Sequence, residues 1–341
     1  VALATIWGAA YRLVNLEETL QFLGDQGRDA IIAYGILHGD FTLVGPSTSV
    51  GSMFLGPLYY YFMAPWLLLA GNNPVGPALA VVLIGIATIP LLYWVGKRLL
   101  GPGPAFMATL LYAYAPVVIL FTRFSWNPNP APIVSLVMLY AGWRAWRGSA
   151  WWWLAVFAAW LVITQLHYVA LLAIVPFGIY GLLDIWRSWR KADQVRLRQI
   201  GYVLLSAFGL FLLSIVPLII FDFKFNHTIL RGFADYFNGD EAGEVLPLTE
   251  RFWIFVKEHH GRGMHVLFEI WGEEWTSWYR EINTWLLIGY AVVMAVADWL
   301  YRRSKYAQGY GLVVLFLIIS ISGLSTYRMP VHYHYISYLF P

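Results

Sequence analysis

Two aspartates and an arginine stand close together near the start of the chain. Asp25 and Asp29 are four residues apart, and Arg28 follows Asp25 by three. Residues at these spacings are neighbours on a helix surface, so a helix over Gly24–Gly35 would bring the three groups to one side. A carboxylate beside a guanidinium stays ionised, because the positive charge favours the charged form. An ionised carboxylate can take a proton from an attacking hydroxyl, so each aspartate is a candidate general base.

The same residues also fit a purely structural role. Asp25 stands where the helix would begin, so its side chain could cap the first turn. Arg28 would then be its surface ion pair, an interaction of little energetic value. Helical spacing alone does not separate Asp25 from Asp29 as the base, and both interpretations stay open at this point.

A second group of polar residues lies in the segment 123–132, which has the sequence RFSWNPNPAP. Arg123 begins it, and Asn127 and Asn129 alternate with prolines. Side-chain amides can orient a sugar or an acceptor by hydrogen bonds. The alternative is an ordinary turn and helix start, which Asn-Pro pairs commonly form.

Histidines supply the remaining candidates. His167 stands at the expected outer end of an apolar helix, where a lone histidine is usually an interfacial residue. Arg328, His332 and His334 gather in the segment YRMPVHYHY. Arginine and histidine are suitable partners for a phosphate at the level of lipid headgroups. A metal is less favoured than a phosphate, because the sequence places no third and fourth ligand beside the two histidines.

The composition shows that these groups are carried by an integral membrane protein. Hydrophobic residues make up 60% of the 341 residues and charged residues only 12%, and the mean hydropathy is +0.61. Soluble domains carry about 25% charged residues. The net charge of +3 is too small to indicate a nucleic-acid partner, and the lack of cysteine excludes disulfides and thiolate catalysis. We therefore expect an all-α, polytopic transmembrane helix bundle in a single domain over 1–341, with further residues beyond both ends of the sequence.

Apolar runs long enough to cross a bilayer define the predicted path. The predicted spans are 77–96, 104–122, 131–146, 150–166, 168–186, 200–221, 284–301 and 310–324, with 1–12 as the end of an earlier span and 335–341 as the start of a later one. Basic clusters follow every second span, so all of them fall on one side, which is the cytoplasm by the positive-inside rule. The opposite face then holds two long outer loops, 15–76 and 222–283, and the candidate residues.

Within the first outer loop, the apolar segment Pro57–Ala70 is short and interrupted by Pro65. It is predicted to be a re-entrant or interfacial helix, because a crossing there would reverse the topology; a short, tilted span is the alternative. Tyr59 and Tyr60 in this segment are expected to line a groove for a lipid tail. The spans hold few ionisable residues near their middles, whereas ion-coupled transporters usually keep such residues there.

The order of these features resembles the polytopic GT-C-fold glycosyltransferases that use polyprenyl-phosphate sugars, especially the branch of protein O-mannosyltransferases and lipid A aminoarabinose transferases. The resemblance covers most of the chain. It consists of GDQGRD at Gly24–Asp29, PLYY at Pro57–Tyr60, GKRLLG at Gly96–Gly101, an outer turn at Arg123, a Thr-Gln turn at Thr164 and a late outer His-Tyr stretch.

The resemblance implies an ionised first-loop aspartate near the reacting centre, a position that Asp25 matches, with Arg28 matching the basic residue three places later. Two departures stand out. Asn127 and Asn129 occupy the second outer loop, where the branch usually has an acidic residue. Leu55 and Gly56 occur where aminoarabinose transferases have a lysine, which argues against aminoarabinose as the sugar.

We therefore expect a transferase of hexosyl or pentosyl groups. It would move a sugar from a polyprenyl-phosphate donor to a hydroxyl of a protein, glycan or lipid acceptor, with inversion. Arg28, Arg328 and either His332 or His334 would neutralise the leaving phosphate. No nucleotide-sugar site is expected, and a requirement for a divalent cation stays open. The expected location is a bacterial or archaeal inner membrane with the site facing outward. A lipid-linked-sugar flippase and a non-catalytic envelope-assembly scaffold are the alternatives.

Overall fold

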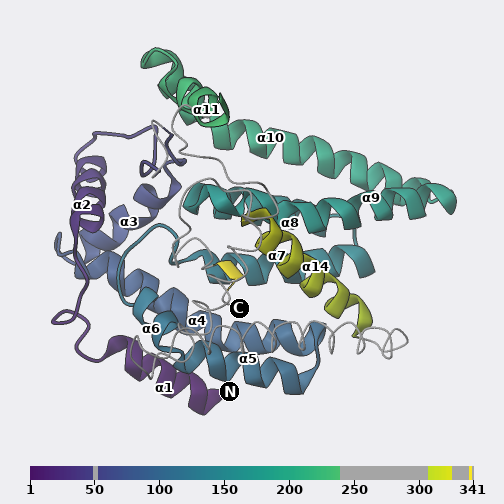
Figure 1. The fold of residues 1–341 in the computed structure, drawn as a ribbon, viewed down its shortest axis with the longest axis horizontal. Coiled ribbons are helices and arrows are strands. Elements are labelled where there is room, and N and C mark those ends of the chain that lie inside the picture. Colours follow the sequence, from purple (N-terminus) through teal and green to yellow (C-terminus); the bar gives the residue numbers. More distant parts are fainter. Residues whose placement is uncertain (49–52, 239–305, 325–337, 340–341) are drawn as a thin grey trace.

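The computed structural model describes residues 1–48, 53–238, 306–324 and 338–339, and it is a bundle of helices (Figure 1). Among these residues no strand occurs, and the only β pairing is an isolated bridge between Ser47 and Phe54. The predicted all-α fold class is therefore confirmed. The predicted span 284–301 lies outside the described residues, as does nearly all of 335–341.

The described helices are α1 (Ala2–Leu13), α2 (Gly24–Leu37), α3 (Leu58–Leu69), α4 (Val75–Leu99), α5 (Pro102–Tyr114), α6 (Pro116–Phe121), α7 (Ala131–Arg147), α8 (Trp152–Leu166), the 3₁₀ helix η1 (Tyr168–Ile174), α9 (Val175–Arg190), α10 (Gln194–Lys224), α11 (Thr228–Asn238) and α14 (Ala307–Leu324). They follow one another with short connections from α3 to α11, whereas longer segments precede α2 and α3. Helix α14 packs against α4, α7, α9 and η1.

Three helical stretches in the described part of the chain are long and apolar enough to cross a membrane. They are Val75–Leu99, Tyr168–Arg190 and Gln194–Lys224. Each contains one of the predicted spans, 77–96, 168–186 or 200–221. Shorter apolar helices at Leu58–Leu69, Trp152–Leu166 and Ala307–Ser320 correspond to other predicted apolar segments. The chain is an integral membrane protein.

The predicted continuous span 104–122 is wrong in one respect, because the helix breaks at Ala115. Pro116 begins α6, and the residue before a proline avoids the helical conformation, so Ala115 is extended with ψ 123°. Pro116 has no N–H for the carbonyl of Tyr112, four residues earlier. The buried Arg12 of α1 fills that gap by donating from Nη2 to the Tyr112 oxygen at 3.0 Å and from Nη1 to that of Ala113 at 3.0 Å.

A second arginine makes the reverse connection. Arg123, which follows α6, donates to the backbone oxygens of Tyr11 and Val14 at the end of α1, the latter at 2.8 Å. Arg12 of α1 therefore satisfies carbonyls at the end of α5, and Arg123 satisfies carbonyls at the end of α1. We call Arg12 and Arg123 the arginine clamp. It fixes α1 against the broken helix α5–α6.

Two glycines allow neighbouring helices of the bundle to pack closely, one of them in α14 and the other in α7. A Cβ atom at Gly309 would lie 2.1 Å from the carbonyl oxygen of Leu99, at the end of α4. A Cβ atom at Gly142 of α7 would lie 2.5 Å from the ring of Phe177 in α9. Real Cβ atoms do not approach so closely, so both positions require glycine for this packing.

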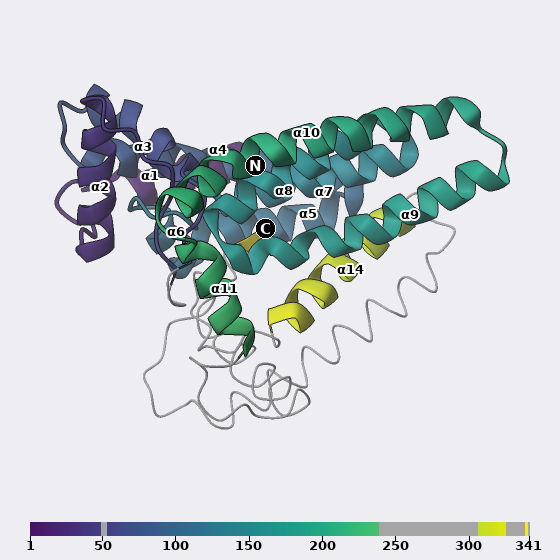
Figure 2. The same ribbon diagram turned by 90° about the horizontal axis from the view of Figure 1, so that it is seen from above.

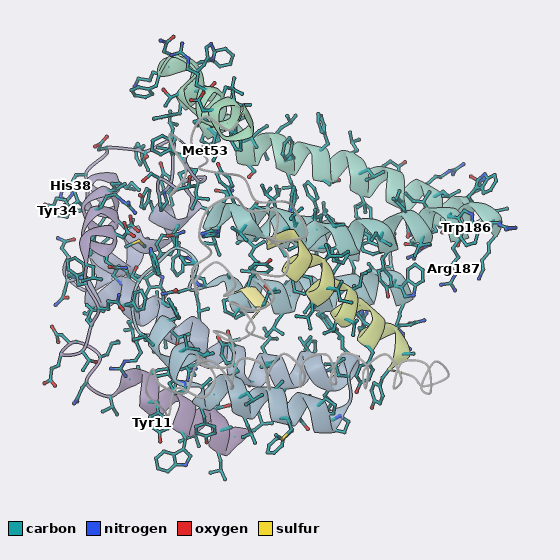
Figure 3. All side chains as sticks on the ribbon, in the orientation of Figure 1. Tyr11, Tyr34, His38, Met53, Trp186 and Arg187 are labelled. Atoms are coloured by element: carbon teal, nitrogen blue, oxygen red, sulfur yellow. The ribbon has the colours of Figure 1, made fainter. Side chains whose placement is uncertain are left out.

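The bundle has two chemically different ends. Helices α2 and α3 lie at one end, and the turn between α9 and α10 lies at the other (Figures 1 and 2). Tyr34 of α2 and Arg187 of α9 mark these two ends in Figure 3. At the second end Arg196 joins two basic turns, because it pairs with Asp184 at 2.6 Å and donates to the Ala145 carbonyl at 2.7 Å. The predicted gathering of the basic clusters on one side is thus confirmed for the described turns.

The described residues cover most of the first predicted outer loop and only the start of the second. Helices α2 and α3 both lie within 15–76, the predicted first outer loop. In the predicted second loop, 222–283, α10 continues to Lys224 and α11 occupies Thr228–Asn238, and the rest lies outside the described residues. Helix α10 also starts six residues before the predicted span, because the Asp193 side chain caps it by accepting from the Arg196 N–H at 3.0 Å.

Candidate active site

Helix α2 carries the acidic candidates, as the sequence predicts. Its start is fixed by Gln26, whose side-chain oxygen accepts the backbone N–H of Leu23 at 2.9 Å. Asp25 lies in the first turn, where the positive end of the helix dipole favours a carboxylate. The helix packs against α3, so one of its sides is covered and the other is open.

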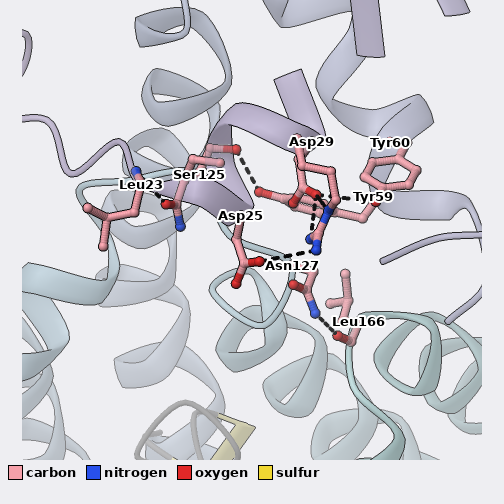
Figure 4. A network of polar contacts seen from close by, with 10 residues as sticks. Leu23, Asp25, Asp29, Tyr59, Tyr60, Ser125, Asn127 and Leu166 are labelled. Atoms are coloured by element: carbon pink, nitrogen blue, oxygen red, sulfur yellow. Dashed lines mark hydrogen bonds and ion pairs between the residues drawn. The ribbon is translucent and has the colours of Figure 1, made fainter. Parts of the chain in front are cut away.

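Asp25 and Asp29 lie in one polar network (Figure 4), and Arg28 pairs with both of them. Its Nη1 lies 3.1 Å from Oδ1 of Asp25. Its Nε and Nη2 lie 2.9 and 2.7 Å from Oδ1 of Asp29. The prediction that helical spacing brings the three groups to one side is confirmed.

The two carboxylates nevertheless occupy different environments. The side chain of Asp25 is 48% exposed, and that of Asp29 is 0% exposed. Arg28, at 36% exposure, lies between the two. A substrate approaching from outside can therefore contact Asp25 and Arg28, while Asp29 is enclosed.

Tyr60 of α3 encloses Asp29, and its hydroxyl donates to Oδ1 at 3.2 Å. The other oxygen, Oδ2, is buried without a hydrogen-bond partner among the described residues. Burial raises the pKa of Asp29 to about 6, although Arg28 and the Tyr60 hydroxyl oppose that rise. The expectation that a carboxylate here is ionised thus holds for Asp29 only above about pH 6.

The neighbouring Tyr59 points elsewhere. Its hydroxyl lies 2.7 Å from Oγ of Ser125, and both groups are buried. This bond ties α3 to the segment between α6 and α7. Of the two tyrosines predicted to line a lipid groove, the structure brings Tyr60 to the acidic network and places Tyr59 in the core.

The two asparagines brace the backbone. Nδ2 of Asn127 donates to the Leu166 carbonyl at the end of α8 at 2.6 Å, as Figure 4 shows. Nδ2 of Asn129 donates to the Phe124 carbonyl at 2.9 Å, and both asparagines are buried. These contacts fit the turn-forming alternative for the segment. Each asparagine donates to a backbone carbonyl from the amide group that was predicted to bind a sugar or an acceptor.

The remaining predicted ligands do not meet the acidic network in the described structure. Arg123 belongs to the arginine clamp. Nδ1 of His167 accepts the backbone N–H of Val169 at 3.3 Å, at the start of η1. Arg328, His332 and His334 lie outside the described residues, so their predicted contact with phosphate stays a prediction.

Sequence reasoning missed the residues that hold α3 in place. Gln165, at the end of α8, accepts the backbone N–H of Leu58 at 3.3 Å and donates to Ser214 of α10 at 2.9 Å. A Cβ atom at Gly56 would lie 2.3 Å from its side-chain oxygen, so only glycine leaves room for this bridge. The Thr-Gln pair at the end of an apolar run was the available signal. Ser125, the partner of Tyr59, carried none.

In the part of the chain that the structure describes, no three histidine or acidic side chains gather as a metal site, and the requirement for a divalent cation stays open.

Comparisons with known proteins found one matching family model and similar solved structures. Residues 55–220 match the model of the family described as dolichyl-phosphate-mannose-protein mannosyltransferase. No curated protein matches the sequence. A crystal structure of ArnT from Cupriavidus metallidurans bound to undecaprenyl phosphate is similar, with a TM-score of 0.57 and 15% identity over 96% of this chain. The apo structure of ArnT aligns with a TM-score of 0.44 and 16% identity, over 95% of this chain and 76% of that one.

The match covers only part of the larger protein, since it includes 60% of the ArnT chain in the lipid-bound structure. At 15% identity the likeness establishes the fold. The expected resemblance is confirmed: the chain is a membrane protein of the GT-C fold, similar to the branch of glycosyltransferases that includes the dolichyl-phosphate-mannose-protein mannosyltransferases and ArnT.

Proposed function

We propose that this protein is a membrane glycosyltransferase that moves a sugar from a polyprenyl-phosphate carrier to an acceptor hydroxyl. The family match over residues 55–220 and the shared fold support this class of reaction. One observation carries the proposal. An accessible carboxylate, Asp25, is paired with Arg28, and the same arginine is paired with a second, buried carboxylate, Asp29.

In the proposed reaction Asp25 is the general base. Its side chain is 48% exposed, and only its Oδ1 bonds to Arg28. Asp29 is enclosed by Arg28 and Tyr60, so an acceptor hydroxyl cannot reach it without rearrangement of α3. Asp29 is therefore a positioning residue that orients the guanidinium.

The bond changes follow from these roles. The acceptor oxygen attacks the anomeric carbon and forms the new glycosidic bond, while its proton passes to Asp25. The bond between the anomeric carbon and the phosphate oxygen breaks, and the polyprenyl phosphate leaves with the bonding electrons. Arg28 neutralises the charge that develops on the phosphate. Attack opposite the leaving group inverts the anomeric centre. Arg328 and either His332 or His334, which lie outside the described residues, are proposed to assist Arg28.

The orientation in the membrane is part of the proposal. The basic turns lie at the end of the bundle away from α2, and basic loops stay in the cytoplasm. The acidic network would then face the outer side of a bacterial or archaeal inner membrane. Donor and acceptor would meet at the level of the outer headgroups.

The test is release of free polyprenyl phosphate from a panel of polyprenyl-phosphate sugars by the purified protein. A general base contributes about 100- to 10,000-fold to a rate, so Asp25→Asn should lower turnover by at least about 100-fold. Asp40→Asn is the matched control, because Asp40 is an exposed carboxylate just beyond α2.

Full turnover by a correctly folded Asp25→Asn sample would contradict the role of Asp25. No release from any donor by the folded wild-type protein, with candidate acceptors present, would favour the flippase or scaffold alternatives.

A further inference from the structure

The end of the bundle away from α2 contains a cavity of about 520 Å³. This volume falls in the range of roughly 300–1,000 Å³ that is typical of small-molecule sites. The cavity lies among the last turns of α4 and α7 and the residue that precedes α14. Its described lining residues are Tyr93, Trp94, Lys97, Arg98, Trp143, Arg147 and Tyr306.

The lining is cationic and aromatic. Lys97, Arg98 and Arg147 all contribute to it, and none of the described lining residues is acidic. The proposed active site differs in kind, because there two carboxylates surround one arginine. An anion is therefore the ligand class that this cavity favours, and phosphate suits the planar donor fork of arginine and the point charge of lysine.

The aromatic rings hold the cations in place. Lys97 Nζ lies 5.9 Å from the ring centre of Tyr93, and the guanidinium of Arg98 lies 3.7 Å above that of Trp94. The guanidinium of Arg147 lies 5.0 Å from the Trp143 ring. Arg98 also donates to the Trp94 carbonyl at 2.8 Å, which uses one of its five N–H donors. The charges are thus oriented before a ligand arrives.

The position of the cavity identifies the source of the anion. Tryptophan and tyrosine at helix ends mark the headgroup level of a membrane. Basic pockets between spanning helices on the cytoplasmic side bind anionic lipid headgroups, and anionic lipids give that leaflet a negative surface. We propose that this cavity binds the phosphate of an anionic phospholipid from the leaflet at the basic end of the bundle.

The experiment uses delipidated full-length protein in neutral detergent, titrated with phosphatidylglycerol or phosphatidylcholine and examined by native mass spectrometry. A basic residue that contacts an anionic headgroup contributes about 1 kcal/mol, and only residues that line the cavity make that contact in this proposal. Arg98→Gln with Arg147→Gln should therefore weaken phosphatidylglycerol binding roughly 10- to 30-fold. Phosphatidylcholine should bind weakly to both proteins.

The matched control is Arg187→Gln with Arg190→Gln. These arginines also stack on tryptophans, Trp146 and Trp186, at the same end of the bundle, but they do not line the cavity. The control should bind phosphatidylglycerol like the wild type. If the double variant does not fold, the exposed Lys97→Gln substitution provides the same test with one charge.

Three results would overturn the proposal: unchanged binding in the cavity variant, equal loss in the control, or equal binding of phosphatidylcholine. Two further arms separate other sources of the same phosphate chemistry. Displacement of phosphatidylglycerol by millimolar inorganic phosphate would assign the cavity to the free anion and overturn the lipid assignment. Displacement by undecaprenyl phosphate but not by excess phosphatidylserine would assign it to the carrier lipid, with the same consequence.

Discussion

Replacement of Asp29 by asparagine measures the free energy that burial of the ionised carboxylate costs the folded protein. In the folded protein, burial raises its pKa from 3.8 to about 6. Each unit of difference corresponds to 1.36 kcal/mol, so ionised Asp29 lowers the free energy of unfolding by about 3 kcal/mol. Asparagine has nearly the same shape and carries no charge.

The sign of the pH dependence follows from linkage. Between about pH 4 and pH 6 the folded state binds the Asp29 proton more tightly than the unfolded state does. The unfolding free energy therefore falls as pH rises. Below the unfolded pKa both states hold the proton, so the full unfolding free energy is present, and about 3 kcal/mol of it is lost as pH rises through the folded pKa of about 6. Asparagine releases no proton, so the unfolding free energy of Asp29→Asn does not change with pH through this position.

The assay is the melting temperature of both proteins in detergent, followed by intrinsic fluorescence from pH 4 to pH 8. Titration of all other groups cancels in the difference between wild type and variant. That difference should fall by roughly 5 °C between pH 4 and pH 6.5 and then stay constant. Asp40→Asn, at an exposed carboxylate, should give a flat difference curve.

A flat curve for Asp29→Asn would refute the reasoning, because it would mean that burial does not alter the pKa. A rising curve would refute it in the opposite sense, since Arg28 would then outweigh burial. Turnover provides the functional counterpart. If Asp29 orients Arg28, the variant should lose turnover at pH 7.5 while its melting temperature is equal to or above that of the wild type.

Three further predictions concern contacts that hold the bundle together. Arg12→Met leaves buried carbonyls without donors and should lower the free energy of unfolding by about 3 kcal/mol or more, measured by thermal melting; an unchanged melting temperature would contradict the clamp. Tyr59→Phe should lower the free energy of unfolding by about 1 to 2 kcal/mol. Adding Ser125→Ala should lower it little further in a double-mutant cycle, because the two substitutions remove the same hydrogen bond. Gly309→Ala should cost about 1 to 3 kcal/mol in the same melting assay, whereas Gly103→Ala, which has open space around it, should not.

The apolar runs and the basic turns were sufficient to predict the helical bundle and its two ends. The break at Ala115 was also present in the sequence, because Pro116 follows it, but hydropathy over 104–122 is continuous and concealed it. Hydropathy measures whether a segment is apolar enough to cross, and it does not record where one backbone hydrogen bond is missing.

The candidate site was only partly predictable for a related reason. Spacing along α2 placed Asp25, Arg28 and Asp29 on one side, and the ion pairs agree. Spacing did not show that Tyr60 covers Asp29, because that contact joins different helices 31 residues apart. Likewise Arg123 was predicted to contact a ligand, because the sequence did not show that it bonds to the end of α1.

The clamp by Arg12 has a consequence for the order of events as the chain is made. The carbonyl partner at Tyr112 is synthesised 100 residues after Arg12, which takes about 5 to 20 s at the ordinary rate of translation. During that interval the guanidinium has only the Gly8 carbonyl of its own helix as a partner, and a charge so incompletely paired in hydrocarbon costs about 2.5 kcal/mol or more. We therefore expect the end of α1 to remain among water or headgroups until α5 emerges. The settled position of α1 then depends on a segment that is synthesised later.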